Sequence, residues 1–98
     1  MIVGKVVGTV VATQKDRGLN GFKLQIVQGV DLRTLEPGGN YLVAVDSVGA
    51  GIDEIVLCTS GSSARLTQMT EDRPVDAVVV AIIDSYELEG NEVYRKGR

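Results

Sequence analysis

The amino-acid sequence predicts an all-β fold, a small closed or partly open barrel of short antiparallel strands. Hydrophobic residues make up 44% of the 98 residues and aromatic residues only 4%, so the core must be built from Val, Ile, Leu and Ala, and the β-branched types favour strands. Twelve glycines suit the turns and bends of a small barrel. Strands do not alternate with helices, which argues against a doubly wound parallel sheet. The length fits one domain over 1–98.

Two strands are predicted in the first third of the chain. Residues 2–13 alternate with a period of two and are rich in valine, and two glycines within them suggest bends. A polar loop over 14–21 follows. Residues 22–28 alternate again, with Phe22 beginning the more apolar face, and this strand should run antiparallel to the first.

Three more strands are predicted between turn signals. The run Pro37-Gly38-Gly39-Asn40 is typical of a turn, and 47–53 is a glycine-rich loop. The strands are expected at 41–46, 54–60 and 77–84. The last of these is the most hydrophobic and should be central.

The remaining segments predict one short helix and a terminal hairpin. Residues 61–69 contain helix formers behind two serines that could cap a helix, and a charged loop follows over 70–76. Residues 86–95 predict a hairpin that turns at Gly90-Asn91. A basic tail, 95–98, ends the chain.

The composition argues against an enzyme. Histidine is absent, which removes the commonest general base and the commonest metal ligand. Cys58 is the sole cysteine, so no disulfide forms within the chain, and a buried structural role is expected for it. We therefore expect no catalytic residues, no metal and no cofactor, and the lone cysteine fits the reducing cytoplasm.

Charge and hydropathy also limit the partners. The formal net charge of −3 is a poor match for nucleic acid or an anionic membrane. No apolar run approaches the ~20 residues that span a bilayer, and the N-terminus lacks the pattern of a signal peptide. We expect neither a nucleic-acid nor a membrane partner.

Two short motifs resemble a dinucleotide-binding site and a serine nucleophile, but the neighbouring residues argue against both functions. Gly49-Ala50-Gly51 has Glu54 where a dinucleotide fingerprint needs its third glycine, and a strand follows instead of a helix. A tight turn is the simpler interpretation. Ser62 has Arg65 three residues on, where a serine nucleophile would need lysine. A helix cap is the simplest role for this serine, although an exposed helix start also attracts anions.

Five segments, in order, resemble the EutN/CcmL family of bacterial microcompartment vertex proteins. They are KVVGTVVAT at 5–13, GFKLQIVQ at 21–28, VAVDSVGAGIDEIVL at 43–57, GSSAR at 61–65 and PVDAVVVAIID at 74–84. The resemblance implies an OB-like five-stranded barrel that assembles as a homo-pentamer and caps the five-fold vertices of a polyhedral shell. It also implies a structural protein without catalysis. The family has glycine where this chain has Asp53, a residue that tolerates left-handed backbone angles.

We therefore expect a cytoplasmic shell protein of a carboxysome-like compartment or metabolosome, in contact with hexameric shell proteins. A ring of identical subunits needs contacts between neighbours and leaves a central opening. The candidate interface residues are Gly49, Ala50, Gly51, Tyr86, Leu88, Val93 and Tyr94. The candidate pore-lining residues are Gly61, Ser62, Ser63 and Arg65.

The alternative is an OB-type nucleic-acid-binding module. Such modules bind single strands through stacking aromatic residues over a basic groove. This chain has only Phe22, Tyr41, Tyr86 and Tyr94 as aromatic residues and carries a net negative charge. A shell protein is the better interpretation.

Overall fold

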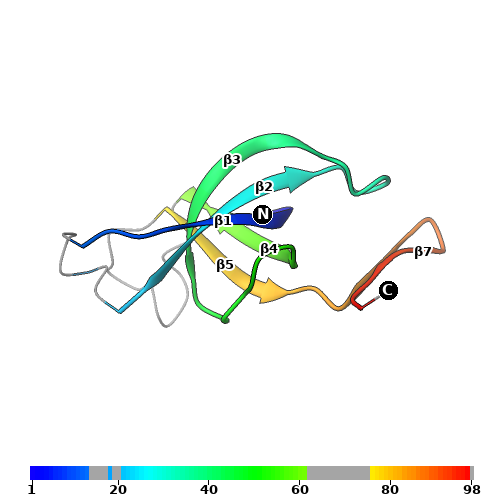
Figure 1. Cartoon of the computed structure of the whole chain (residues 1–98). Coiled ribbons are helices and arrows are strands. Elements are labelled where there is room, and N and C mark those ends of the chain that lie inside the picture. Colours follow the sequence, from blue (N-terminus) through cyan, green and yellow to red (C-terminus); the bar gives the residue numbers. More distant parts are fainter. Residues whose placement is uncertain (14–17, 19–20, 62–75, 98) are drawn as a thin grey trace.

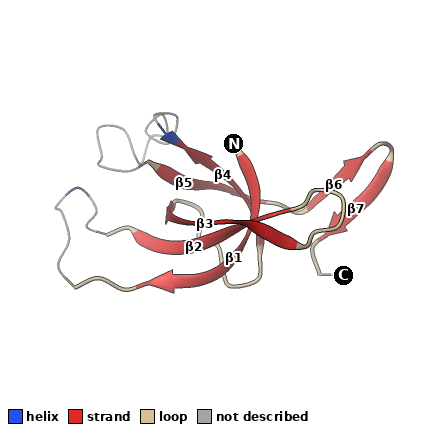
Figure 2. Cartoon of the chain, turned by 90° about the horizontal axis from the view of Figure 1, so that it is seen from above, coloured by secondary structure: helices blue, strands red, loops and turns tan. Residues whose placement is uncertain are grey.

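A computed structural model describes residues 1–13, 18, 21–61 and 76–97. Within these residues the chain forms a closed barrel in the order β1-β2-β3-β5-β4 and a separate two-stranded sheet, β6-β7 (Figures 1 and 2). The strands are β1 (Ile2–Val10), β2 (Lys23–Val30), β3 (Pro37–Asp46), β4 (Ile55–Ser60), β5 (Ala77–Ile82), β6 (Ser85–Leu88) and β7 (Asn91–Arg95). The predicted small barrel with a terminal hairpin is confirmed.

One neighbouring pair in the barrel is parallel. Four pairs run antiparallel, as expected, whereas β3 and β5 pair in parallel through Val45↔Val78 and Asp46↔Val79. The reason is parity. A closed ring of five strands returns to its starting direction only after an even number of reversals, so at least one pair must be parallel.

The barrel interior is filled by small and β-branched side chains. The interior cluster consists of Val6, Val27, Ala44, Ala50, Val56, Cys58, Ala77 and Val79. On β2 the residues that point inward are Gln25 and Val27, while Leu24 packs with a second cluster around Val45 and Val78. The face that begins at Phe22 is the more apolar in sequence, but it lies outside the barrel.

The turn between β2 and β3 comes earlier than predicted. Pro37-Gly38-Gly39-Asn40 does not turn but begins β3. The reversal occurs over 31–36, where the Asp31 carboxylate accepts hydrogen bonds from the backbone N–H groups of Arg33 and Thr34 at 2.8 and 3.0 Å. Gly39 is needed for a different reason: a Cβ there would lie 2.9 Å from the Cα of Gly29, so the two strands approach too closely for a side chain.

The hairpin turn is shifted by one residue from its predicted position. Leu88 pairs with Asn91, so the two-residue turn is Glu89-Gly90 and not Gly90-Asn91. Both turn residues have positive φ, 54° and 82°, as a hairpin turn that follows the strand twist requires. The first strand ends at Val10 instead of residue 13. Of the predicted helix over 61–69, only Gly61 lies within the described residues.

Candidate subunit interface

The loop over 47–53, between β3 and β4, is held by contacts with the barrel interior. Ala50 is fully buried in the barrel interior, and its carbonyl accepts a 2.7 Å hydrogen bond from Gln25 Nε2. Gln25, itself 1% exposed, also donates to Asp46 Oδ2 at 3.3 Å. The amide of Gln25 therefore joins the end of β3 to the centre of the loop that follows it.

Backbone capping fixes the beginning of this loop. Asp46 Oδ1 accepts hydrogen bonds from the N–H groups of Val48 and Gly49, both at 2.9 Å. The Ser47 hydroxyl donates to the carbonyl of Val79 on β5 at 2.6 Å. These contacts fix the backbone as it leaves β3 and satisfy polar groups that would otherwise need water.

The end of the loop is fixed by charged groups. The Gly51 N–H donates to Glu54 Oε1 at 2.6 Å, and Lys96 Nζ lies 2.6 Å from Glu54 Oε2. The hydrogen bonds from Lys96 and from the Gly51 N–H lower the pKa of the Glu54 carboxyl. Asp53 has a φ of 71°, the left-handed conformation expected where the family has glycine, and its N–H donates to the Val6 carbonyl.

Two apolar side chains of this fixed loop face solvent. Val48 is 40% exposed and Ile52 is 56% exposed. An apolar side chain on a loop held by its backbone loses little further conformational entropy when a partner covers it. The sequence-based expectation singled out Gly49, Ala50 and Gly51, but Ala50 is covered by its own barrel. Val48 and Ile52 are the side chains of this loop that a neighbouring subunit could contact. The sequence feature that could have identified them is an isolated apolar residue within a glycine-rich loop.

A groove of about 930 Å³ lies at the other end of β3. It is bordered by the start of β1, the 31–36 turn and the first half of β3. Its exposed apolar side chains are Met1, Ile2, Leu32 and Tyr41, of which Met1 and Tyr41 are more than two-thirds exposed. Together they form an exposed apolar patch of the kind that marks interaction surfaces, and no local pattern in the sequence pointed to it.

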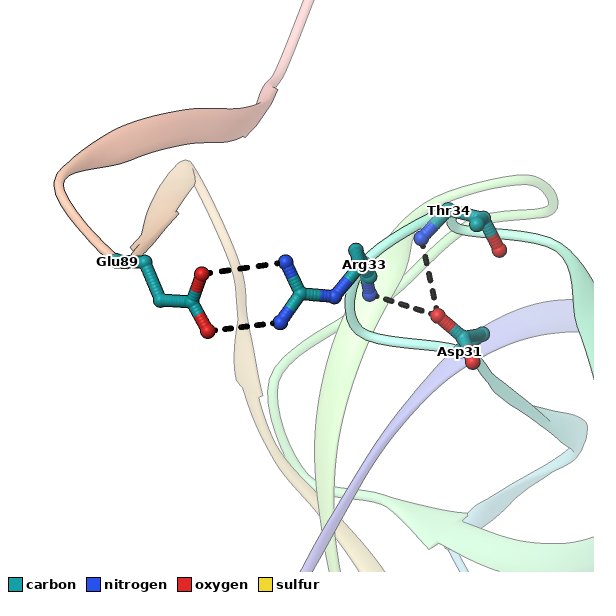
Figure 3. A network of polar contacts seen from close by, with 4 residues as sticks. All are labelled: Asp31, Arg33, Thr34 and Glu89. Carbon is teal, nitrogen blue, oxygen red and sulfur yellow. Dashed lines mark hydrogen bonds and ion pairs between the residues drawn. The ribbon is translucent and has the colours of Figure 1, made fainter.

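The terminal hairpin is tied to its own barrel beside this groove. Arg33 on the 31–36 turn forms two hydrogen bonds with the Glu89 carboxylate, at 2.8 and 3.4 Å (Figure 3). The Tyr86 hydroxyl donates to the Leu32 carbonyl at 2.5 Å, and the rings of Tyr86 and Tyr94 stack with centroids 6.3 Å apart. The four predicted hairpin interface residues, which also include Leu88 and Val93, are half-buried.

The predicted pore residues can be placed only in part. Ser62, Ser63 and Arg65 lie outside the described residues. Gly61 is exposed, has a φ of 65°, and its N–H donates to the Asp76 carbonyl at 2.6 Å.

Neither a thiol of lowered pKa nor a metal-binding cluster is found among the described residues. Cys58 is fully buried, and burial, with a smaller contribution from Asp46, raises the pKa of its thiol to about 11. Among the residues that the structure describes, no three Cys, Asp or Glu side chains gather as a metal site would require. In the same part of the chain, no helix has the length and apolar character to cross a bilayer.

Known proteins are similar to this chain over most of its length. Residues 1–84 match the family described as "Ethanolamine utilisation protein EutN/carboxysome". The carboxysome shell vertex protein CcmL of Nostoc sp. is 52% identical, over 98% of this chain and 95% of the relative. The microcompartment shell vertex protein EutN of Salmonella typhimurium is 41% identical, over 98% and 96%.

Solved structures extend the similarity to three dimensions. The structure of Gloeobacter violaceus CcmL superposes with a TM-score of 0.93 at 44% identity and covers 100% of both chains. The pentameric microcompartment shell protein GrpN of Rhodospirillum rubrum gives 0.79 at 46% identity, over 90% of this chain and 100% of that one. This chain belongs to the EutN/carboxysome family and is a vertex protein of a bacterial microcompartment shell.

Proposed function

We propose that five copies of this chain form a closed ring and that the ring caps the five-fold vertices of the shell. The observation that carries the proposal is the match, over nine-tenths of the chain, to a shell protein described as pentameric. Hexagonal tiles alone make a flat layer, and pentagons supply the curvature that closes it. The exposed apolar side chains around the groove and on the 47–53 loop fit a subunit that buries surface against its neighbours.

The same proposal includes the partners and the absence of catalysis. The edges of the ring would contact hexameric shell proteins, and the ring would act by shape alone. The absence of histidine and the raised pKa of the Cys58 thiol support a purely structural role, because a nucleophilic thiol requires a lowered pKa. Lining of the central opening by Gly61, Ser62, Ser63 and Arg65 belongs to this proposal too.

Native mass spectrometry of the full chain tests the ring. We expect about 52 kDa for five copies of the 10.4 kDa chain. A monomer or dimer at micromolar concentration would refute the proposal. Co-expression with a hexameric shell protein, viewed by electron microscopy, tests the vertex role: closed polyhedra should need this chain, and open sheets or tubes should form without it.

A further inference from the structure

The 47–53 loop and the groove both expose apolar side chains, as two surfaces that contact each other between subunits would. The loop is fixed by Gln25, Asp46 and Glu54, and it exposes Val48 and Ile52. The groove is concave and exposes apolar side chains, of which Tyr41 is the largest. A monomer that leaves both surfaces in water gains stability when a second molecule covers them.

The two surfaces lie at opposite ends of β3. The groove is bordered by residues from Gly38 to Leu42, and the loop begins directly after Asp46. In Figure 1 the turn between β2 and β3 is at the upper right, and the loop between β3 and β4 is at the bottom. Tyr41 lies five residues before Asp46, roughly 17 Å along the strand, and no residue of the 47–53 loop lines the groove of its own chain.

We infer that the 47–53 loop of one subunit docks into the groove of the next, with Ile52 against the apolar side chains around Tyr41. A contact between two different surfaces of identical chains is heterologous, and repetition of it closes a ring when the rotation allows. The occupant of the groove is thus a second copy of this chain. This inference rests on the proposed ring and specifies its interface. Gln25 is a positioning residue for that interface, because it holds the loop at Ala50.

Complementary variants test the contact. Tyr41→Glu alters the groove and Ile52→Glu alters the loop, and each should reduce the native mass from the ring to a folded 10.4 kDa monomer. Mixed together, the two variants retain one intact groove and one intact loop, so they should form a heterodimer of about 21 kDa that cannot grow. Val11→Glu is the matched control, because Val11 is 86% exposed and lies on neither surface. It should keep the ring.

Crosslinking gives a readout that does not depend on disrupting the assembly. The sole native cysteine, Cys58, is buried, so Tyr41→Cys with Ile52→Cys places two accessible thiols on each chain. A short bismaleimide should join these chains into a ladder of up to five on denaturing gels. Val11→Cys with Ile52→Cys should give no ladder. A wild-type ring with neither a Tyr41–Ile52 ladder nor a heterodimer would overturn the inference but not the ring, whereas a wild-type monomer would refute the ring itself.

Discussion

Arg33 and Glu89 are 56 residues apart in sequence, yet two hydrogen bonds join the guanidinium of one to the carboxylate of the other (Figure 3). Arg33 lies on the turn between β2 and β3, and Glu89 is the first residue of the hairpin turn. The carboxylate of Asp31 orders the same turn by accepting the N–H of Arg33. The pair therefore links the hairpin turn to the barrel beside the groove.

Arg33→Ala should release the hairpin without unfolding the barrel. Both side chains are exposed, and exposed pairs contribute little to global stability, so the melting temperature should change only slightly. Amide hydrogen exchange across residues 85–95 should become faster, while exchange in β2 and β5 stays unchanged. Arg33→Lys is the informative companion, because lysine keeps the charge but loses the paired geometry and should restore protection only in part. Unaltered exchange in Arg33→Ala would show that Tyr86 alone holds the hairpin.

Gln25→Met should destabilise the fold by about 1–3 kcal/mol, because it leaves the buried Ala50 carbonyl without its donor at little change in volume. Urea unfolding followed by far-ultraviolet circular dichroism measures this loss. Gln28→Met is the control: Gln28 donates to the Gly39 carbonyl at an exposed position, and its loss should cost less than about 1 kcal/mol. Equal losses in the two variants would contradict the role given to the Gln25–Ala50 contact.

The Glu54–Lys96 pair should make the stability sensitive to acid. The pKa of the Glu54 carboxyl is lowered from its ordinary 4.5, so its contribution is complete above that pH and disappears as the pH falls through the lower pKa of the folded state. The contribution is small because both side chains are partly exposed. Melting temperatures measured from pH 6 to pH 3 should fall less steeply for Glu54→Gln than for the wild type.

Lys96→Met provides a second measurement of the same pair. Removing the ammonium removes the largest cause of the lowered Glu54 pKa, so the pKa of the folded state moves closer to that of the unfolded state. The acid-induced loss should therefore be smaller, and should end at a higher pH, than in the wild type. Identical pH profiles in all three proteins would mean that other carboxyls dominate the acid response.

The Cys58 thiol should be unreactive in the folded protein. It is fully buried, and its pKa of about 11 leaves less than about 1% thiolate at pH 8. Labelling by a maleimide at pH 8 should be at least about 100-fold slower than in urea, where the thiol is exposed and its pKa is ordinary. Rapid native labelling would show that β4 opens readily.

Leu88 on the hairpin remains a predicted interface residue. Leu88→Asp should shift the native mass towards smaller assemblies, because half-buried apolar surface at a contact would be replaced by a charge that loses its water. Glu87→Gln, one residue away on the opposite face of the same strand, should keep the wild-type mass. A full ring in both variants would remove the hairpin from the interface.

Local sequence patterns were enough to predict the strand content, the approximate order of the elements and the family. Period-two patterns and β-branched residues require only local geometry, so β1, β2, β4 and β5 were each predicted to within a few residues. The motifs that resemble the EutN/CcmL family lie on these strands and the loops between them. The left-handed conformation of Asp53 was also predictable, because the family has glycine at this position and aspartate tolerates that conformation.

The features that depend on strand pairing could be known only from the folded chain. The parallel β3–β5 contact follows from closing an odd number of strands, and no local pattern encodes it. Pro37-Gly38-Gly39-Asn40 looks like a turn in sequence, but Gly29 lies so close to Gly39 that glycine is needed within the strand. The side of β2 that faces inward was set by register, which brings Gln25 beneath Ala50. The groove and the Arg33–Glu89 pair join segments remote in sequence, and only folding the chain could bring them together.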